Sequence, residues 1–106
     1  MSTTNAATSH GDERARAIAL LESNHSFPTD YALSVIARNA EEVAERVLAA
    51  AFEDLEAERP DGAHQTLPSS GGKYISHRLT IRCQDAEQVL RVYARLRAIE
   101  GVLTIL

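Results

Sequence analysis

The segment from Tyr31 to Leu106 contains two successive strand–helix–strand units, and this order constrains the fold more than any other feature of the chain. Gly71 and Gly72 lie between the two units and are typical of a hairpin turn. A β-α-β-β-α-β order is that of the split βαβ motif. We therefore predict an α+β fold, a two-layer ferredoxin-like sandwich. Its antiparallel sheet should have the strand order 4-1-3-2, with both helices on one face.

The strands are predicted from alternating apolar residues. In the segment from Tyr31 to Arg38, every second side chain from Leu33 onwards is apolar and should face the helices. The segment from Lys73 to Cys83 alternates most clearly, and it should bury Ile75, His77, Leu79, Ile81 and Cys83. The segment from His64 to Ser69 contains Pro68, which favours a strand at the sheet edge. Val102 to Leu106 should form the last strand.

Two helices are predicted from capping residues and helical spacing. Asn39 stands as an N-cap, with Glu42 at the capping-box position, and this helix should run to about Glu58. Asp85 caps the second helix, with Gln88 at the matching position. Its buried stripe should comprise Ala86, Val89, Leu90, Tyr93 and Leu96. The predicted core contains Leu33, Val35, Val47, Leu79, Ile81 and Leu90.

The N-terminal part has little to bury. Met1 to Gly11 is polar and should be disordered, and Asp12 to Glu22 has the composition of a short, loosely docked helix. Phe27 is apolar in a polar connector and should anchor it to the domain. We therefore divide the chain into residues 1–26, a tail with a short helix, and residues 27–106, the ferredoxin-like domain.

Composition excludes several classes of protein. The apolar runs are far shorter than a membrane span. The N-terminus also lacks the basic start followed by an apolar block that is typical of a secretory signal, so we expect no such signal. The single cysteine, Cys83, indicates a reducing cytoplasm. A net charge of −4 and a pI near 5.5 give no general attraction to nucleic acid, which makes it an unfavoured partner.

No constellation of residues predicts catalysis. The four histidines lack the spacing of a metal site, so we expect no metal and no cofactor. His77 and Cys83 lie on the predicted buried face, where structural roles are favoured. Ser69 to Lys73 lacks the spacing of a phosphate-binding P-loop and is followed by a strand. The phosphate loop of an acylphosphatase-type enzyme is also not visible, so we expect no enzyme.

The uncovered sheet face is the most suggestive surface. It should carry Tyr74, Arg78 and Arg82 beside Ser34, Ile36 and Arg38. RNA-recognition modules stack bases on such a face, which makes RNA binding the alternative function. Here only Tyr74 could stack. The competing interpretation is that long arginine stems, or a second subunit, cover the sheet.

Several segments resemble the YbeD-type family, small bacterial proteins often labelled lipoate regulatory proteins. They are Phe27-Pro28, Pro68 to Ser76, Tyr93 with Leu96, and Val102 to Leu106. The resemblance implies a ferredoxin-like fold close to the ACT regulatory domains that sense amino acids, and no active site. ACT ligand sites usually use a glycine after the first strand, where this chain has Arg38-Asn39-Ala40.

We therefore predict a small, non-catalytic cytoplasmic regulator that binds a partner protein or a small metabolite. A link to lipoate metabolism is implied by the family resemblance alone. The candidate binding residues lie at two turns: Arg38 and Asn39 after the first strand, and Ser70, Gly71, Tyr74 and Ser76 around the hairpin. At the first turn, free N–H groups and the helix dipole should favour an anion. The apolar last strand, at a sheet edge, predicts a homodimer.

Overall fold

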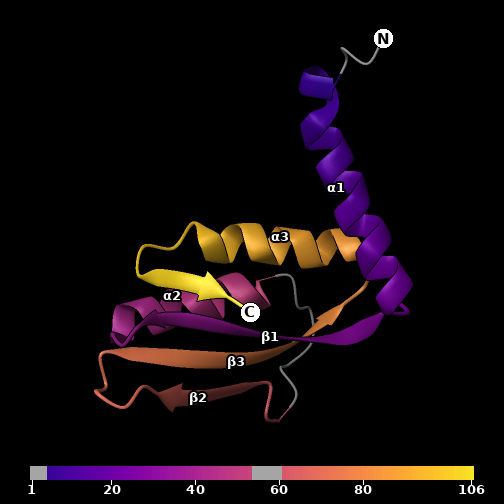
Figure 1. The fold of residues 1–106 in the computed structure, drawn as a ribbon. Coiled ribbons are helices and arrows are strands. Elements are labelled where there is room, and N and C mark those ends of the chain that lie inside the picture. Colours follow the sequence, from indigo (N-terminus) through magenta and orange to yellow (C-terminus); the bar gives the residue numbers. More distant parts are fainter. Residues whose placement is uncertain (1–4, 54–60) are drawn as a thin grey trace.

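The protein folds as two layers, a sheet and a pair of helices, in a computed structural model (Figure 1). The structure describes the backbone of residues 5–53 and 61–106, and the side chains of 11–53 and 61–106. The sheet has four antiparallel strands in the order β2-β3-β1-β4. This is the predicted order 4-1-3-2 read from the other edge, so the α+β ferredoxin-like prediction is confirmed. The strands are β1 (Thr29–Arg38), β2 (His64–Pro68), β3 (Tyr74–Cys83) and β4 (Val102–Ile105).

Two helices, α2 (Glu41–Phe52) and α3 (Ala86–Arg97), cover one face of the sheet. Each follows a strand and returns the chain to the next one, as the βαββαβ order requires. The predicted end of α2 near Glu58 falls outside the described residues, since the description stops at 53 and resumes at 61. No helix of the described part is both long and apolar enough to cross a membrane.

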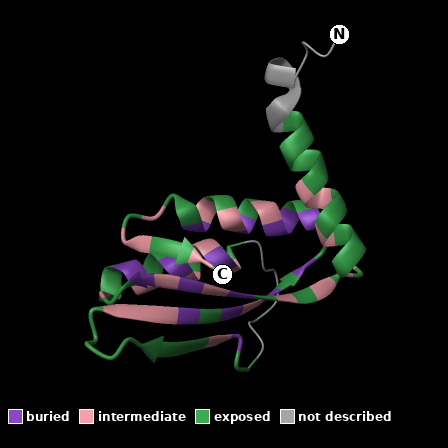
Figure 2. Ribbon diagram, viewed as in Figure 1, coloured by how far each residue is buried: buried purple, intermediate pink, exposed green. Residues whose placement is uncertain are grey.

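The core lies between the helices and the inward face of the central strands (Figure 2). Leu33 faces Leu79 across β1 and β3, as the predicted alternation requires. The fully or almost fully buried apolar residues of this cluster are Leu33, Val35, Ala37, Val43, Val47, Ala51, Leu79, Ile81, Cys83, Val89, Val92 and Leu96.

The prediction that Leu90 is a core residue is wrong, and Ile75 and Tyr93, which were also predicted on buried faces, are only partly buried. Leu90 is only partly buried, and Val92 is buried in its place. Each residue of a helix is rotated by about 100° from the last, so Val92 lies about 60° from Val89 around the helix axis, whereas Leu90 lies about 100° from Val89 on the other side. Leu90 is turned to the side of that face.

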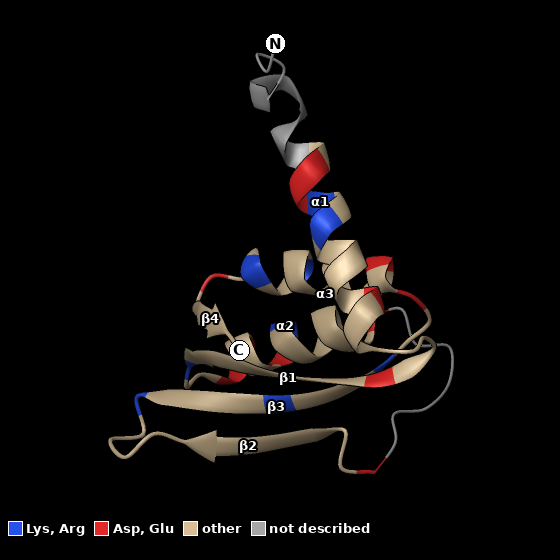
Figure 3. Cartoon of the chain, turned by 45° about the vertical axis from the view of Figure 1, so that its right-hand side comes forward, with Lys and Arg blue, Asp and Glu red and all other residues tan. Residues whose placement is uncertain are grey.

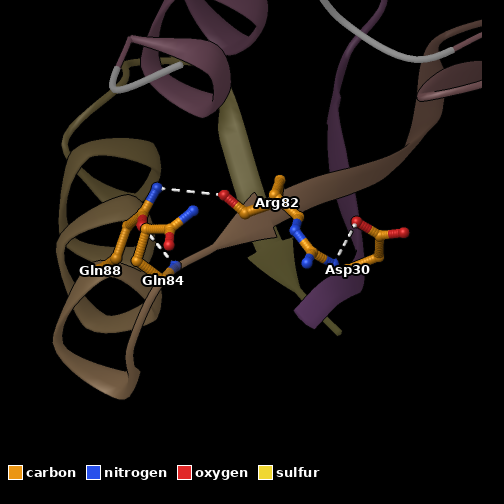
Figure 4. Close-up of polar contacts among 4 residues, drawn as sticks. All are labelled: Asp30, Arg82, Gln84 and Gln88. Carbon is orange, nitrogen blue, oxygen red and sulfur yellow. Dashed lines mark hydrogen bonds and ion pairs between the residues drawn. The ribbon is translucent and has the colours of Figure 1, made fainter. Parts of the chain in front are cut away.

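The start of α3 is built as predicted, with one difference. Asp85 accepts a hydrogen bond at Oδ1 from the backbone N–H of Gln88 at 2.8 Å, which confirms the N-cap. The Gln88 side chain accepts from the N–H of Gln84, one residue before the cap, and donates to the carbonyl of Arg82 (Figure 4). Gln88 is 5% exposed, so these two bonds satisfy a polar side chain inside the core.

The N-terminal helix is longer than predicted. α1 runs over Asn5–Asn24 rather than from Asp12 to Glu22, and it projects from the two layers (Figure 1). Residues 5–11, predicted to be disordered, are therefore part of the helix, and residues 1–4 lie outside the description. A polar segment that contains alanine can form a helix through intrinsic propensity alone. An apolar stripe is not needed for such a helix, so the apolar pattern does not predict it.

A small group of contacts attaches α1 and the connector after it to the domain. Arg14 forms an exposed ion pair with Glu87 of α3 at 3.4 Å. Leu21 and Phe27 pack against the core cluster. Phe27 therefore anchors the connector as expected, and its peptide bond to Pro28 is cis.

Candidate functional site

The two turns that sequence analysis singled out lie side by side at one corner of the sheet. Arg38, the last residue of β1, is the cross-strand neighbour of Tyr74, the first residue of β3. The turn into α2 therefore meets the hairpin between β2 and β3. We use the term sheet corner for Arg38, Asn39, Ser70, Gly71 and Tyr74.

Asn39 joins the two turns instead of capping α2. Its backbone N–H donates to the carbonyl of Lys73 at 2.9 Å, and its Nδ2 donates to the carbonyl of Gly72 at 2.9 Å. The N-cap residue of α2 is Ala40, which makes no side-chain capping bond. The capping prediction is thus wrong, because the helix begins one residue later and the amide of Asn39 points to the hairpin. Sequence patterns cannot detect this contact between residues so far apart.

The hairpin itself is a tight, self-bonded turn. The N–H of Gly72 donates to the carbonyl of Ser69, and the hydroxyl of Ser69 accepts from the N–H of Tyr74 at 3.2 Å. Gly72 has a φ of 73°, which an ordinary residue rarely adopts. Ser70 and Gly71 form the exposed tip, and a side chain added at Gly71 would meet nothing. Ser70 and Gly71 are therefore free of packing constraints.

The charges of the sheet corner are mixed. Arg38 contacts Glu42 at 3.9 Å, and the ammonium of Lys73 lies 5.5 Å from the ring centroid of Tyr74. Glu41 and Glu42 occupy the first turn of α2 and already complement its dipole. In addition, the N–H groups of Asn39 and Ala40 are hydrogen-bonded. The helix start is therefore less favourable to an anion than its dipole alone would be.

Ser76 belongs to the uncovered face of the sheet rather than to the corner. It lies two residues beyond Tyr74 on the same side of β3, between Ile36 of β1 and Leu67 of β2. The predicted site residues thus divide into the corner and one residue farther along the open face.

A pair of histidines lies under the helices near β2, and only one of them was predicted to be buried. His77 is 1% exposed, and its Nδ1 lies 2.9 Å from Nε2 of the half-buried His64. The two rings are stacked, with centroids 5.2 Å apart. The Nε2 atom of His77 is buried without a hydrogen-bond partner. Burial, and to a smaller extent the neighbouring His64, hold the pKa of His77 below its usual value.

A second cluster joins α1, β1 and α3 through aromatic side chains. Tyr31 contacts Tyr93 edge to face, and their hydroxyl oxygens are 3.4 Å apart. Burial, followed by the hydrogen bond to Tyr93, raises the pKa of Tyr31 well above its ordinary value. The ring of His25 packs against both Phe27 and Tyr31, with centroid distances of 6.1 Å and 5.1 Å. This cluster holds the connector that follows α1 against β1 and α3.

The described residues do not assemble a metal-binding group. In residues 11–53 and 61–106, no three or more His, Cys, Asp or Glu side chains come together in a way that could hold a metal ion. Cys83 is buried in the core cluster.

The described elements form a small α+β domain with a ferredoxin-like fold. The structure is similar to the ACT domain from the GTP pyrophosphokinase of Chlorobium tepidum, with a TM-score of 0.54 and 11% sequence identity. The match covers 74% of this chain and 97% of that domain. At this identity, the likeness establishes the fold alone. No curated protein matches the chain.

The chain belongs to DUF493, a family described as "Protein of unknown function". The family model matches residues 22–106, which begins near the end of α1 and includes every strand. Most of α1 therefore lies outside the part of the chain that defines the family.

Proposed function

We propose that this protein is a small, non-catalytic cytoplasmic regulator that acts by binding a partner at the sheet corner. The observation that carries the proposal is the pair of hydrogen bonds from Asn39 to the hairpin. They hold Arg38 and Tyr74 beside the exposed tip at Ser70 and Gly71. An ACT-like fold in a family of unknown function is compatible with a regulatory role.

Two side chains of the corner, Arg38 and Tyr74, favour binding because they contribute little to the stability of the fold. Arg38 is exposed, and an exposed ion pair at 3.9 Å contributes little to stability, so its guanidinium can change partner at low cost. Tyr74 is half-buried, and a tyrosine so placed offers an apolar ring together with a polar hydroxyl. Such groups suit a partner that carries a carboxylate next to an apolar surface.

A protein partner fits the corner better than a small metabolite. Small ligands usually bury most of their surface in a concave pocket. Arg38, Asn39, Ser70 and Gly71 are all exposed on the outside of two turns. A metabolite is the second candidate ligand. The link to lipoate metabolism rests on the YbeD-type resemblance alone.

The proposal includes a homodimer formed along β4. This strand lies at the sheet edge, beside β1, and it contains no charged residue. Leu103 lies between Val102 and Thr104, where the register of the β1–β4 pairing shifts, and it is 58% exposed. An apolar edge strand favours pairing with another strand, and a two-fold dimer closes such an edge.

The binding proposal is tested with Arg38→Ala and Tyr74→Ala. Immobilised wild-type protein and each variant are exposed to a lysate of the source organism, and captured proteins and small molecules are identified by mass spectrometry. We expect both variants to keep the wild-type melting temperature and lose the captured partner. Arg46→Ala, an exposed position on α2, is the control and should capture normally. Equal capture by all four proteins would refute the corner as the site.

A further inference from the structure

The uncovered sheet face carries a cation in a hollow at its centre. Arg78 is exposed in the middle of β3, between Ser34 of β1 and Gln65 of β2. These residues and Thr80 line a hollow of about 370 Å³. Both α2 and α3 lie on the other side of the sheet (Figure 1). The hollow is therefore open to a partner.

The neighbours of Arg78 are neutral groups that can donate hydrogen bonds. Ser34 and Thr80 contribute hydroxyls, and Gln65 contributes an amide. Among the described side chains of these strands that lie on this face, Asp30 carries a carboxylate, and it pairs with Arg82 at 3.4 Å (Figure 4). Arg82 is four residues from Arg78, or about 13 Å along an extended strand. Arg78 and its neighbours thus form a site suited to an anion.

Aliphatic side chains surround this polar centre. Leu106 lies in the same cross-strand row as Arg78, beside Ser34, and is 71% exposed. Leu67 and Ile36 lie in the next row, and Leu67 is 58% exposed. β2 carries no charged residue, whereas β3 has a basic segment near its middle (Figure 3). A partner covering this face would bury apolar area around one charge.

We propose that the open face binds an acidic polypeptide segment, whose carboxylate pairs with Arg78 while apolar side chains cover Leu67, Ile36 and Leu106. A hollow on the surface of a sheet would contact a small anion from one side only. A polypeptide, in contrast, can lie across several strands. The aliphatic flanks also distinguish this surface from a nucleic-acid platform, which relies on aromatic stacking.

The positive charge of Arg78 disfavours a second copy of this chain packed face to face on the sheet. A two-fold axis through the centre of the sheet would bring Arg78 against Arg78 without a carboxylate between them. The partner chemistry that satisfies this face is therefore negative. Arg78 lies four residues from Tyr74 of the sheet corner along the same face of β3, and the inference does not depend on the corner's role.

The test uses two fluorescein-labelled ten-residue peptides, one alternating Glu and Leu and the other alternating Gln and Leu. Binding to the full chain is measured by fluorescence anisotropy at low salt. We expect the Glu–Leu peptide to bind at least about tenfold more tightly, because hydrogen bonds to charged groups are the stronger ones. We also expect its binding to shift the amide NMR signals of Ser34, Gln65 and Thr80.

Arg78→Glu should weaken the Glu–Leu peptide by about tenfold or more. Arg46→Glu makes the same charge change on α2 and should leave binding within about twofold of wild type. Equal affinity for the two peptides, or equal weakening by the two variants, would overturn the proposal. So would tighter binding of a ten-nucleotide thymidine strand, or light scattering showing a dimer that Arg78→Glu dissociates.

Discussion

Asn39 and Gly72 are joined by a 2.9 Å hydrogen bond from the side-chain amide to the backbone carbonyl, and this contact links the β1–α2 turn to the β2–β3 hairpin. It replaces the helix cap that the sequence favoured. The two roles demand opposite chemistry, since the contact with Gly72 needs a donor and a cap needs an acceptor. Substitution at this position can therefore distinguish them.

We expect Asn39→Asp to destabilise the fold at least as much as Asn39→Ala. Alanine removes the hydrogen bond, at a cost of about 0.5–1.5 kcal/mol in the free energy of unfolding. Aspartate also places a negative oxygen against the carbonyl of Gly72. The measurement is urea unfolding of both variants. If Asp instead keeps wild-type stability while Ala loses it, Asn39 acts as a cap, because the two residues cap helices about equally well.

Gly101 should tolerate no side chain. Its φ is 101°, and an added Cβ would lie 2.9 Å from Cγ2 of Val43, which is fully buried. We expect Gly101→Ala to reduce the free energy of unfolding by about 1–3 kcal/mol, through backbone strain and overpacking. Gly71→Ala is the matched control, since nothing lies within 4 Å of its added Cβ. Equal stability of the two variants in thermal unfolding would contradict the crowding at Gly101.

Stability should fall below neutral pH because of His77. Its pKa is lowered in the folded state, so the fold prefers the neutral ring. The resulting stabilisation is complete above the unfolded pKa of about 6.5 and is lost as pH falls from there toward the folded pKa. One such group changes the free energy of unfolding by at most about 1.4 kcal/mol per pH unit.

The measurement is urea unfolding of wild type and His77→Phe between pH 7.5 and 5. Phenylalanine keeps a ring at this buried position but cannot take up a proton, so the variant should lose less stability on acidification. His25→Phe, at a partly exposed position, is the control for the general effect of losing a histidine. Parallel pH profiles for wild type and His77→Phe would show that His77 is not the group responsible.

The proposed dimer predicts a mass of two chains at high micromolar concentration. Light scattering of the wild-type protein should give that mass, and Leu103→Lys should give one chain, because a charged side chain on an edge strand opposes pairing. Leu67→Lys places the same charge on β2 at the opposite edge and should remain dimeric. A wild-type protein that scatters as a single chain would remove the dimer.

The sequence was most informative where local pattern and long-range packing agree. The alternation in β1 and β3 correctly predicts Leu33, Val35, Leu79 and Ile81 as buried. Local chemistry also predicts the cap at Asp85, because the partner is only three residues away. These features depend on the periodicity of a single element.

The sequence was less informative where a residue's role is set by a distant neighbour. Asn39 is committed to a hairpin that begins some thirty residues later, and the stacking of His64 on His77 depends on the β2–β3 register. Both are common residues in ordinary local contexts. Similarly, whether Leu90 or Val92 faces the core depends on the angle at which α3 lies on the sheet.

The place of β1 in the sheet has a consequence for synthesis. Both of its neighbours come later in the chain, β3 after α2 and β2, and β4 after α3. While the polypeptide is being translated, Leu33 and Val35 must therefore leave the ribosome on a strand with two open edges. Closing such long loops is slow, and unpaired apolar strands are prone to aggregation. β1 is the first strand to be made, and because it waits for β4, it is the last to have both of its edges paired.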